Sequence, residues 1–596
     1  MEEEITPYAS LAFDIILNYF VQAYKNKENQ ILYGVLIECI TSLGIYTREK
    51  YNKVIPDIVN CIVEIVKGFN SDKIEPIRAD LTNSLDRLLD VLKDDFKPLL
   101  PNLIETVLVL IKLRPQMSIS SDPTEQFDIN NILKEEEDEG DKKKGKEIQT
   151  SETEELATSL SLLNTFIKSI GSGFLAYYDR VESEILQLIT YKLDSKIRTK
   201  SSKILPNLLT IITDQDSKFK KGKEYIKILI NAFDEETSYH VVDKYFVHLR
   251  EIIENCGQFL NKNELNELFT KITKIFVTLK EKREKLLLNK KQKLKKHNDD
   301  DEDDEDIADL IEEDIEDIES IQTEISDCIG IMFKTHKQIS DEIISFILTK
   351  IIPSYSTSKN IFEIKMGLYI TDDLIEYIGQ DMLGEENWNL MFKIITQLVA
   401  DKDVSIRQAA AYGIGNFAKF TTKNFDNYAQ KLIESLYNGM NIKNEEEEEK
   451  NEEEEDEEYD AFGVAFDNMV AALGKIINFQ INNSKIVQGG INELINKWIM
   501  NLPIKYDDTE MEPQHEWLVD LFLLKRELIG ENYYNHYFET LADIYEAKKS
   551  TDIINEKIKK IFNQYVKNED KLKQIVAKIY ENGDDTLKKK LEKLIK

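Results

Sequence analysis

Carboxylates and histidines are the side chains in this 596-residue sequence that would perform acid–base or metal chemistry. Asp372, Asp373 and Glu376 lie close together on one predicted helix, and paired carboxylates can act as a general acid and base. His240 and His248 are eight positions apart, which places them on one helical face, but two surface or groove-lining residues explain that spacing better than a metal pair. No nucleophile or further base accompanies the acids. We therefore predict no catalytic residue and no metal ligand, and interpret the acids as a patch on the inner face of a solenoid.

The glycine-rich and nucleophile motifs of enzymes are missing from the sequence as well. Gly413-Ile414-Gly415 lies inside a predicted helix, and Gly171-Ser172-Gly173 does not follow a predicted strand, as a phosphate-binding loop would. The chain has no Walker sequence, no H-E-x-x-H motif and no G-x-S-x-G elbow. We predict that the protein is not an enzyme and binds no cofactor.

The helices that would position these residues are indicated by a repeated turn. Asp401 precedes Arg407 by six positions, Asp72 precedes Arg78 by the same spacing, and a looser version occupies residues 193–198. An Asp that ends one helix and reaches an Arg early in the next is typical of HEAT repeats, whose period is about 40–47 residues. The sequence thus predicts an all-α fold, a HEAT-repeat (armadillo-like) solenoid with a right-handed superhelical twist. A glycine follows an apolar residue near the end of several predicted inner helices. Each is expected either to cap its helix or to let a neighbouring helix approach closely: Gly44, Gly330, Gly415 and Gly474.

Composition narrows the possible partners. The net charge is −34, so the phosphates of DNA or RNA would be repelled over most of the surface, whereas basic proteins would be attracted. The four cysteines are far apart and form no C-x-x-C pair, which favours free thiols over a metal site or disulfide framework. The N-terminus lacks the features of a signal peptide, and no segment stands out as a membrane span. We expect an intracellular protein that inserts into no membrane and binds no nucleic acid directly.

Three charged segments interrupt the helical pattern. We expect HEAT repeats at 1–116, 153–285, 311–440 and 459–596, a charged loop at 117–152, a basic-to-acidic segment at 286–310 and an acidic low-complexity loop at 441–458. Dense like charges repel and bury no apolar area, so these segments are predicted to be disordered or frayed loops. They serve either as solubilising loops or as electrostatic contacts for basic partners. The candidate contact acids in the second segment are Asp299, Asp300, Asp301, Glu302, Asp303 and Asp304.

A collinear series of phrases resembles one protein family. The phrases are Ile37 to Gly44, Ile148 to Ser151, Gly367 to Glu376, Ile406 to Gly413, Ala472 to Ile476 and Trp498 to Pro503. Together they are similar to the C-terminal half of importin-beta-type karyopherins, and most similar to the importin beta-three (importin-five) branch. The N-terminal half of such receptors has no counterpart in this sequence.

The resemblance implies a nuclear transport receptor. Members bind basic cargo such as ribosomal proteins and histones through nuclear localisation signals, bind Ran-GTP, which releases the cargo, and bind Phe-Gly nucleoporins. The resemblance also implies that inner-face acids, here Asp372, Asp373 and Glu376, meet the basic nuclear localisation signals. It further implies a monomer that shuttles between cytoplasm and nucleus through the nuclear pore. Two alternatives stay open, namely a HEAT-repeat scaffold without a transport role and an acidic chaperone for basic proteins.

Overall fold

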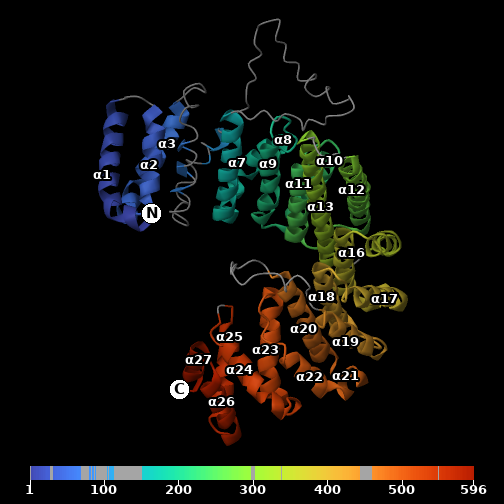
Figure 1. The fold of residues 1–596 in the computed structure, drawn as a ribbon. Coiled ribbons are helices and arrows are strands. Elements are labelled where there is room, and N and C mark those ends of the chain that lie inside the picture. The colour runs from blue at the N-terminus through green and yellow to red at the C-terminus, as the bar shows by residue number, and fades with distance from the viewer. Residues whose placement is uncertain are drawn as a thin grey trace. The chain divides into compact units, whose positions relative to one another are not determined.

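The computed structural model describes residues 2–26, 31–68, 151–296, 302–336, 339–442, 460–547 and 549–595, with isolated positions between 80 and 112. Every regular element in these ranges is helical and none is a strand, which confirms the predicted all-α class (Figure 1). The chain divides into two compact units, residues 1–260 with 271–331 and residues 261–270 with 332–596. Asp72, Arg78, Asp299, Asp300 and Asp301 lie outside the described residues, as do 117–150 and 443–459.

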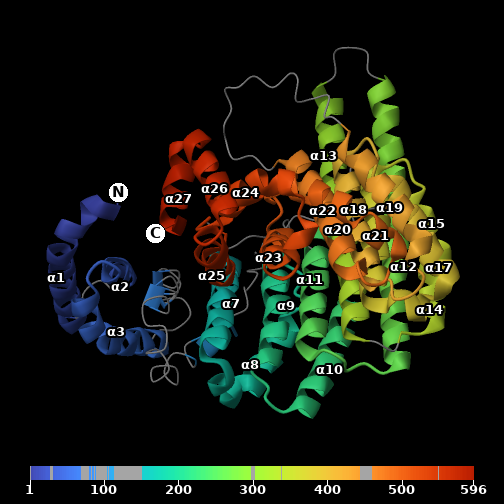
Figure 2. The same ribbon diagram turned by 90° about the horizontal axis from the view of Figure 1, so that it is seen from below.

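The first unit consists of helices that stack side by side (Figure 2). Its helices are α1 (Glu2–Asn26), α2 (Ile31–Gly44), α3 (Arg48–Gly68), α7 (Ser151–Ile170), α8 (Tyr178–Leu188), α9 (Ser195–Thr210), α10 (Gln215–Phe233) and α11 (Tyr239–Cys256), followed by most of α12 (Lys262–Lys296) and α13 (Glu302–Thr335). A 3₁₀ turn, Gly171–Tyr177, joins α7 to α8. Helix α9 packs against α7 on one side and α11 on the other, so it buries two faces.

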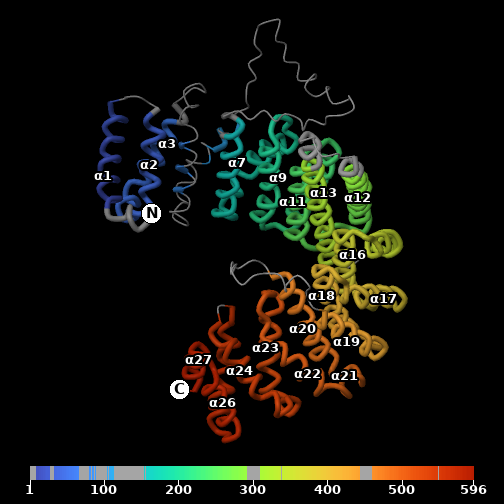
Figure 3. The backbone as a smooth tube through the Cα atoms, viewed as in Figure 1, coloured from blue at the N-terminus to red at the C-terminus, as the bar shows by residue number. Residues whose placement is uncertain are grey.

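The second unit repeats this arrangement, as the tube in Figure 3 shows. Its helices are α14 (Asp341–Phe346), α15 (Ile352–Ser356), α16 (Ile361–Asp373), α17 (Gly379–Leu398), α18 (Val404–Phe420), α19 (Asp426–Met440), α20 (Ala461–Gln480), α21 (Lys485–Gly489), α22 (Ile491–Ile499), α23 (Asp508–Lys525), α24 (Tyr534–Ile544), α25 (Asp552–Ile561), α26 (Asp570–Asn582) and α27 (Asp585–Ile595). Three π-helical turns, Ile347–Ile351, Leu374–Ile378 and Phe562–Val566, continue α14, α16 and α25. Helices α16, α18, α20 and α23 form one row, hereafter the inner row, and α17 and α19 pack beside it.

Small residues explain how closely the inner row packs. A Cβ added to Gly415 would lie 2.8 Å from Cδ of Lys475 and 3.4 Å from Cα of Ala472, and one added to Gly474 would lie 2.1 Å from Oε1 of Gln514. Gly44 is the last residue of α2, as expected, whereas Gly415 and Gly474 lie inside their helices. The close approach of neighbouring helices, and not a cap, is therefore the role of these two interior glycines.

The basic-to-acidic segment is helical over most of its length, so the predicted disordered loop at 286–310 is wrong for residues 286–296 and 302–310. Lysines end α12, and Glu302, Asp303 and Asp304 begin α13, an order that the helix dipole favours at both ends. Arg283 on α12 donates from Nη1 to Oε1 of Glu319 on α13 at 2.6 Å, and an ion pair between Lys290 and Glu312 joins the helices again. Such cross-helix pairs, together with the high helix propensity of Lys and Glu, offset the repulsion between like charges.

Helix α20 corrects the expectation that no segment is long and apolar enough to span a membrane. By length and composition Ala461–Gln480 passes that test, but 72% of its most apolar window is buried within the protein. It packs against α18, α22 and α23 in the second unit. Its apolar side chains are therefore those of a core helix that is buried among its neighbours.

Candidate binding site

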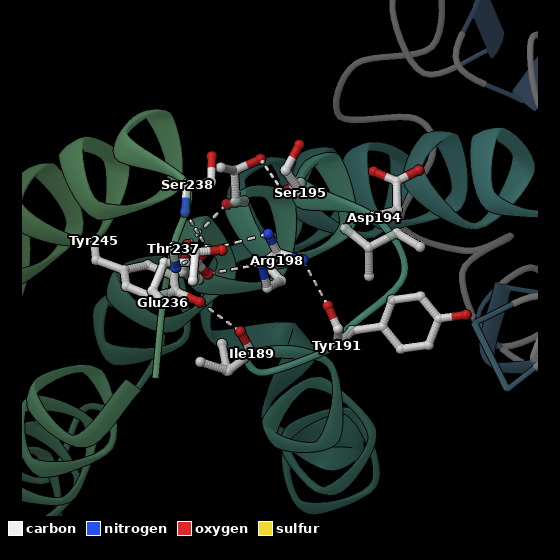
Figure 4. Close-up of polar contacts among 12 residues, drawn as sticks. Ile189, Tyr191, Asp194, Ser195, Arg198, Glu236, Thr237, Ser238 and Tyr245 are labelled. Atoms are coloured by element: carbon white, nitrogen blue, oxygen red, sulfur yellow. Dashed lines mark hydrogen bonds and ion pairs between the residues drawn. The ribbon is translucent and has the colours of Figure 1, made fainter. Parts of the chain in front are cut away.

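Arg198 shows how the repeat turns are built (Figure 4). Its Nε and Nη2 donate to the two carboxylate oxygens of Glu236 at 2.7 and 3.1 Å, and its Nη1 donates to the backbone carbonyl of Tyr191 at 2.8 Å. Glu236 also accepts from the backbone N–H groups of Thr237 and Ser238 at 3.0 and 2.9 Å. The two charged side chains are only 10% and 6% exposed, so this forked pair ties the turn before α9 to the turn before α11 in a nearly dry environment.

Arg407 occupies the equivalent place in the first turn of α18, but it does not use the Asp401 carboxylate. Its Nη1 donates to the backbone carbonyls of Asp401 and Lys402, both at 2.9 Å, and its side chain is buried. The Asp401 carboxylate accepts from the N–H of Asp403, at 2.9 Å. Asp403 in turn caps α18 by accepting from the N–H groups of residues 405 and 406, as Asp194 caps α9 by accepting from that of residue 196. The repeated unit is thus an N-cap Asp with an Arg four positions later.

A ladder of polar contacts crosses the inner row. Glu376, in the π-helical turn after α16, accepts from Oη of Tyr412 and Nδ2 of Asn416 on α18, both at 3.2 Å. Nζ of Lys475 on α20 lies 5.1 Å from the centre of the Tyr412 ring and forms a buried ion pair with Glu510 on α23. Polar contacts therefore join α16, through the turn that continues it, to α18, and then α18 to α20 and α20 to α23, and these contacts favour one register of stacking.

The three predicted contact acids at the end of α16 and in the turn after it differ in their exposure to solvent. Asp372 is only 5% exposed, and its Oδ1 points toward Gly413, where an added Cβ would lie 2.3 Å away. Burial raises the pKa of Asp372 well above its usual range, and the charges of Asp373 and Glu376 raise it further. A buried acid of this kind cannot present a charge to a partner, so its position does not support the prediction for Asp372. Asp373 and Glu376 are half-buried and remain candidates.

The histidine pair does not form a metal site. His248 is buried and its Nδ1 lies 2.9 Å from Oγ of Ser202, whereas His240 is exposed. Burial lowers the pKa of His248 to about 3. Within the ranges that the structure describes, no group of three His, Cys, Asp or Glu side chains is arranged to hold a metal ion, and all four cysteines are free thiols.

A pocket of the second unit holds more accessible acids. Its volume is about 600 Å³, and it lies between the start of α20, the segment that links α22 to α23, and α24. Four carboxylates line it, from Asp460, Asp467, Glu539 and Asp543, against a single ammonium group, that of Lys505. Aromatic rings also line the pocket, those of Phe462, Phe466 and Tyr506. Carboxylates beside aromatic rings favour a cationic side chain, and the volume suits one or two residues of a peptide.

Two of the four acids have structural roles and two are free to bind. Oδ2 of Asp467 accepts the N–H groups of residues 505, 506 and 507 at 2.9, 2.6 and 3.2 Å, and Oδ1 of Asp460 caps α20 by accepting from Gly463 at 2.9 Å. Glu539 and Asp543 are exposed and lie one turn apart on α24. Partial burial raises the pKa of Asp543, an effect that the nearby Lys590 and Lys505 oppose. We name these two acids the α24 pair.

Sequence reasoning missed this pocket because its walls come from three separate segments. The spacing of Glu539 and Asp543 is common on any exposed helix, and only the folded chain brings Asp460 and Asp467, from the start of α20, to the same cavity. The sequence carries no local signal for that arrangement.

Comparison with known proteins places the fold. No family profile matches the chain. Over 209 residues it is 25% identical to Importin subunit beta-3 of Saccharomyces cerevisiae, an alignment that covers 34% of this chain and 18% of the yeast protein. This similarity confirms the resemblance to the importin beta-three branch.

Solved structures of the karyopherin Kap121p match nearly the entire chain. A Kap121p mutant superposes with a TM-score of 0.72 at 18% identity, covering 99% of this chain and 51% of that one. The TM-score is 0.71 at 17% identity for Kap121p bound to RanGTP and 0.70 at 18% identity for Kap121p bound to Pho4p. Each match covers 50% of the Kap121p chain. The fold is thus the HEAT-repeat solenoid of karyopherins. The chain spans about half the length of these structures.

Proposed function

We propose that this chain is a module of a nuclear transport receptor, which binds basic protein cargo and is regulated by Ran-GTP. The single observation that carries this proposal is the match of 98–99% of the chain to Kap121p, which has been solved with RanGTP, with Pho4p and with Nup53p. By the same reasoning the chain acts by reversible binding, without catalysis, and moves between cytoplasm and nucleus.

The pocket beside α24 is the part of this chain that we assign to basic cargo. Its four carboxylates face one ammonium group, and the chain carries a net charge of −34, so a cationic peptide is attracted at long range and held at short range. Ribosomal proteins and histones have the required charge. Asp373 and Glu376 are a second, smaller group of candidate contacts.

Fluorescence anisotropy with a labelled Lys/Arg-rich peptide tests this assignment. We expect Glu539→Gln and Asp543→Asn each to weaken binding up to about fivefold, because an exposed charge pair contributes up to about 1 kcal/mol. Asp381→Asn is the matched control, since Asp381 is an exposed acid of the same unit outside the pocket. Equal affinities for all three variants would exclude the pocket as the cargo site.

Adding Ran to the same titration separates transport from the alternatives. Ran loaded with a non-hydrolysable GTP analogue should release the peptide, and Ran-GDP should not. A scaffold or an acidic chaperone would retain the peptide with both forms of Ran. Its binding would still weaken when the salt is raised from 0.1 to 1 M, because the Debye length then shortens from about 10 to about 3 Å.

A further inference from the structure

The pocket beside α24 has walls of large apolar side chains as well as acids. Phe462 and Phe466 lie one turn apart near the start of α20, and both are half-buried. Met500 and Tyr506 come from the segment that links α22 to α23, and they are 46% and 49% exposed. The folded chain therefore leaves four large apolar or aromatic side chains partly open where they line this cavity.

The three aromatic rings of the pocket gather at one turn of α20. An added Cβ at Gly463 would lie 2.4 Å from Cδ2 of Tyr506, so only a glycine lets this ring lie against the helix. Gly463 is in the same turn as Phe462 and Phe466. The Phe462 ring already contacts a cation of the protein, because Cζ of Arg407 lies 5.9 Å from its centre. The pocket thus combines three neighbouring rings, one of which is known to accept a cation.

The carboxylates on the α20 side of the pocket supply charge, but their hydrogen-bonding capacity is partly used. Oδ2 of Asp467 accepts three backbone N–H groups, and Oδ1 of Asp460 accepts the N–H of Gly463. Such hydrogen bonds stabilise the charged form of a carboxylate. The α24 pair is exposed to water on the opposite wall. A cation beside the rings therefore meets negative charge, while two acceptor oxygens near it are already occupied.

Aromatic walls and occupied acceptors favour one kind of cation. The ammonium group of lysine has three N–H donors, which lose hydrogen bonds to water when the group enters a pocket with few free acceptors. The trimethylammonium group of trimethyllysine carries the same charge and has no N–H donor. Aromatic rings attract such a group by a cation–π interaction, and its methyl groups pack on apolar walls. These requirements match the walls of this pocket.

We propose that the pocket beside α24 binds a trimethyllysine side chain of a basic peptide and prefers it to unmethylated lysine. The rings of Phe462, Phe466 and Tyr506 contact the methyl groups, and the four carboxylates supply the opposite charge. Choline headgroups carry the same quaternary ammonium, but a basic peptide is favoured because the net charge of −34 also attracts its other cations. The inference rests on the proposed cargo role of this pocket and names the side chain that it selects.

Fluorescence anisotropy with the full chain and three forms of one labelled Lys/Arg-rich peptide tests this preference. The forms differ at one central position, which carries lysine, trimethyllysine or the neutral tert-butyl analogue of trimethyllysine. We expect the trimethylated form to bind about fivefold more tightly than the lysine form, which corresponds to about 1 kcal/mol, the size of one cation–π contact. The neutral analogue has the same shape and should lose this gain, because the rings attract the charge.

A single substitution assigns the preference to the rings. Phe466→Leu removes one ring and keeps an apolar side chain, so the preference for the trimethylated form should fall to about twofold or less. Phe420→Leu is the matched control, since Phe420 is a half-buried aromatic residue of the same unit outside the pocket, and it should keep the fivefold preference. If Phe466→Leu does not fold, the three peptides with the unaltered chain still decide.

Other results would overturn the preference, and they separate it from the cargo role. If the lysine form binds as tightly as the trimethylated form or more tightly, the preference is refuted, and the cargo role stands as long as Glu539→Gln and Asp543→Asn weaken both. A neutral analogue as tight as the trimethylated form would show a merely apolar pocket. Choline that competes as well as the trimethylated peptide would assign the pocket to a headgroup. Failure of all three forms to bind would refute both the preference and the cargo role.

Discussion

The buried pair between Arg198 and Glu236 is the interaction whose loss should affect the first unit most clearly. The substitution Arg198→Met keeps the length of the side chain and removes its charge and three hydrogen bonds. Glu236 then remains nearly buried without its cation, although it still accepts from two backbone N–H groups. Breaking a buried pair costs about 3–5 kcal/mol, and the two remaining donors place the expected loss at the lower end, about 3 kcal/mol.

The assay is amide hydrogen exchange, because a protein of many repeats need not unfold in one step. Repeats couple mainly to their neighbours, so the loss should be confined to α9, α10 and α11. A loss of about 3 kcal/mol corresponds to a decrease in protection of about 100-fold. Lys423→Met is the control, since the Lys423–Asp381 pair is 69% and 67% exposed and should contribute less than about 1 kcal/mol.

A double variant shows whether the pair itself is responsible. Arg198→Met with Glu236→Gln removes both charges, so part of the lost protection should return, with a coupling energy of about 0.5–3 kcal/mol. If Arg198→Met costs no more than Lys423→Met, or if protection falls equally in α24 to α27, the account of this turn is wrong.

Three further predictions concern the second unit. Gly474→Ala should destabilise this unit by about 1–2 kcal/mol in urea unfolding, because the new Cβ would lie 2.1 Å from Oε1 of Gln514. The control Gly489→Ala, whose Cβ would meet nothing within 4 Å, should be neutral or stabilising, and equal unfolding midpoints for the two variants would contradict this. Burial lowers the pKa of His515 to about 4, below its ordinary value near 6.5, so the unfolded chain binds the proton first. Stability should therefore be complete above about pH 6.5 and fall as the pH drops toward 4, by up to about 1.4 kcal/mol per unit, and a His515→Gln variant with the same pH slope would refute this. Asp403→Ala should cost about 1 kcal/mol in thermal unfolding by removing the cap of α18, and an unchanged midpoint would argue against the cap.

The sequence predicted the helical class and the place of the turns before α9 and α18, because both depend on local spacing. It did not predict the geometry of Arg407, since its spacing from Asp401 suggested a carboxylate partner while the structure pairs it with backbone carbonyls. Which oxygen an Arg reaches depends on the path of the turn, and Asp403 already fixes that path as the cap.

The basic-to-acidic segment was predicted less well and the binding pocket was not predicted, for two different reasons. The dense charges of residues 286–310 suggested a loop, but residues 286–296 and 302–310 are helical, and the pairing of α12 with α13 through Arg283 and Glu319 stabilises these helices. The pocket beside α24 depends on which helices stack together. A single sequence gives the faces of its helices, and the partner of each face is a property of the folded chain.

The most direct measurement of the central claim is a pull-down from cell extract with this chain as bait, washed either with Ran bound to a non-hydrolysable GTP analogue or with Ran-GDP. The account predicts that basic nuclear and ribosomal proteins are captured and that only the GTP form releases them. Basic proteins retained equally under both washes would contradict a transport role and favour a scaffold or chaperone.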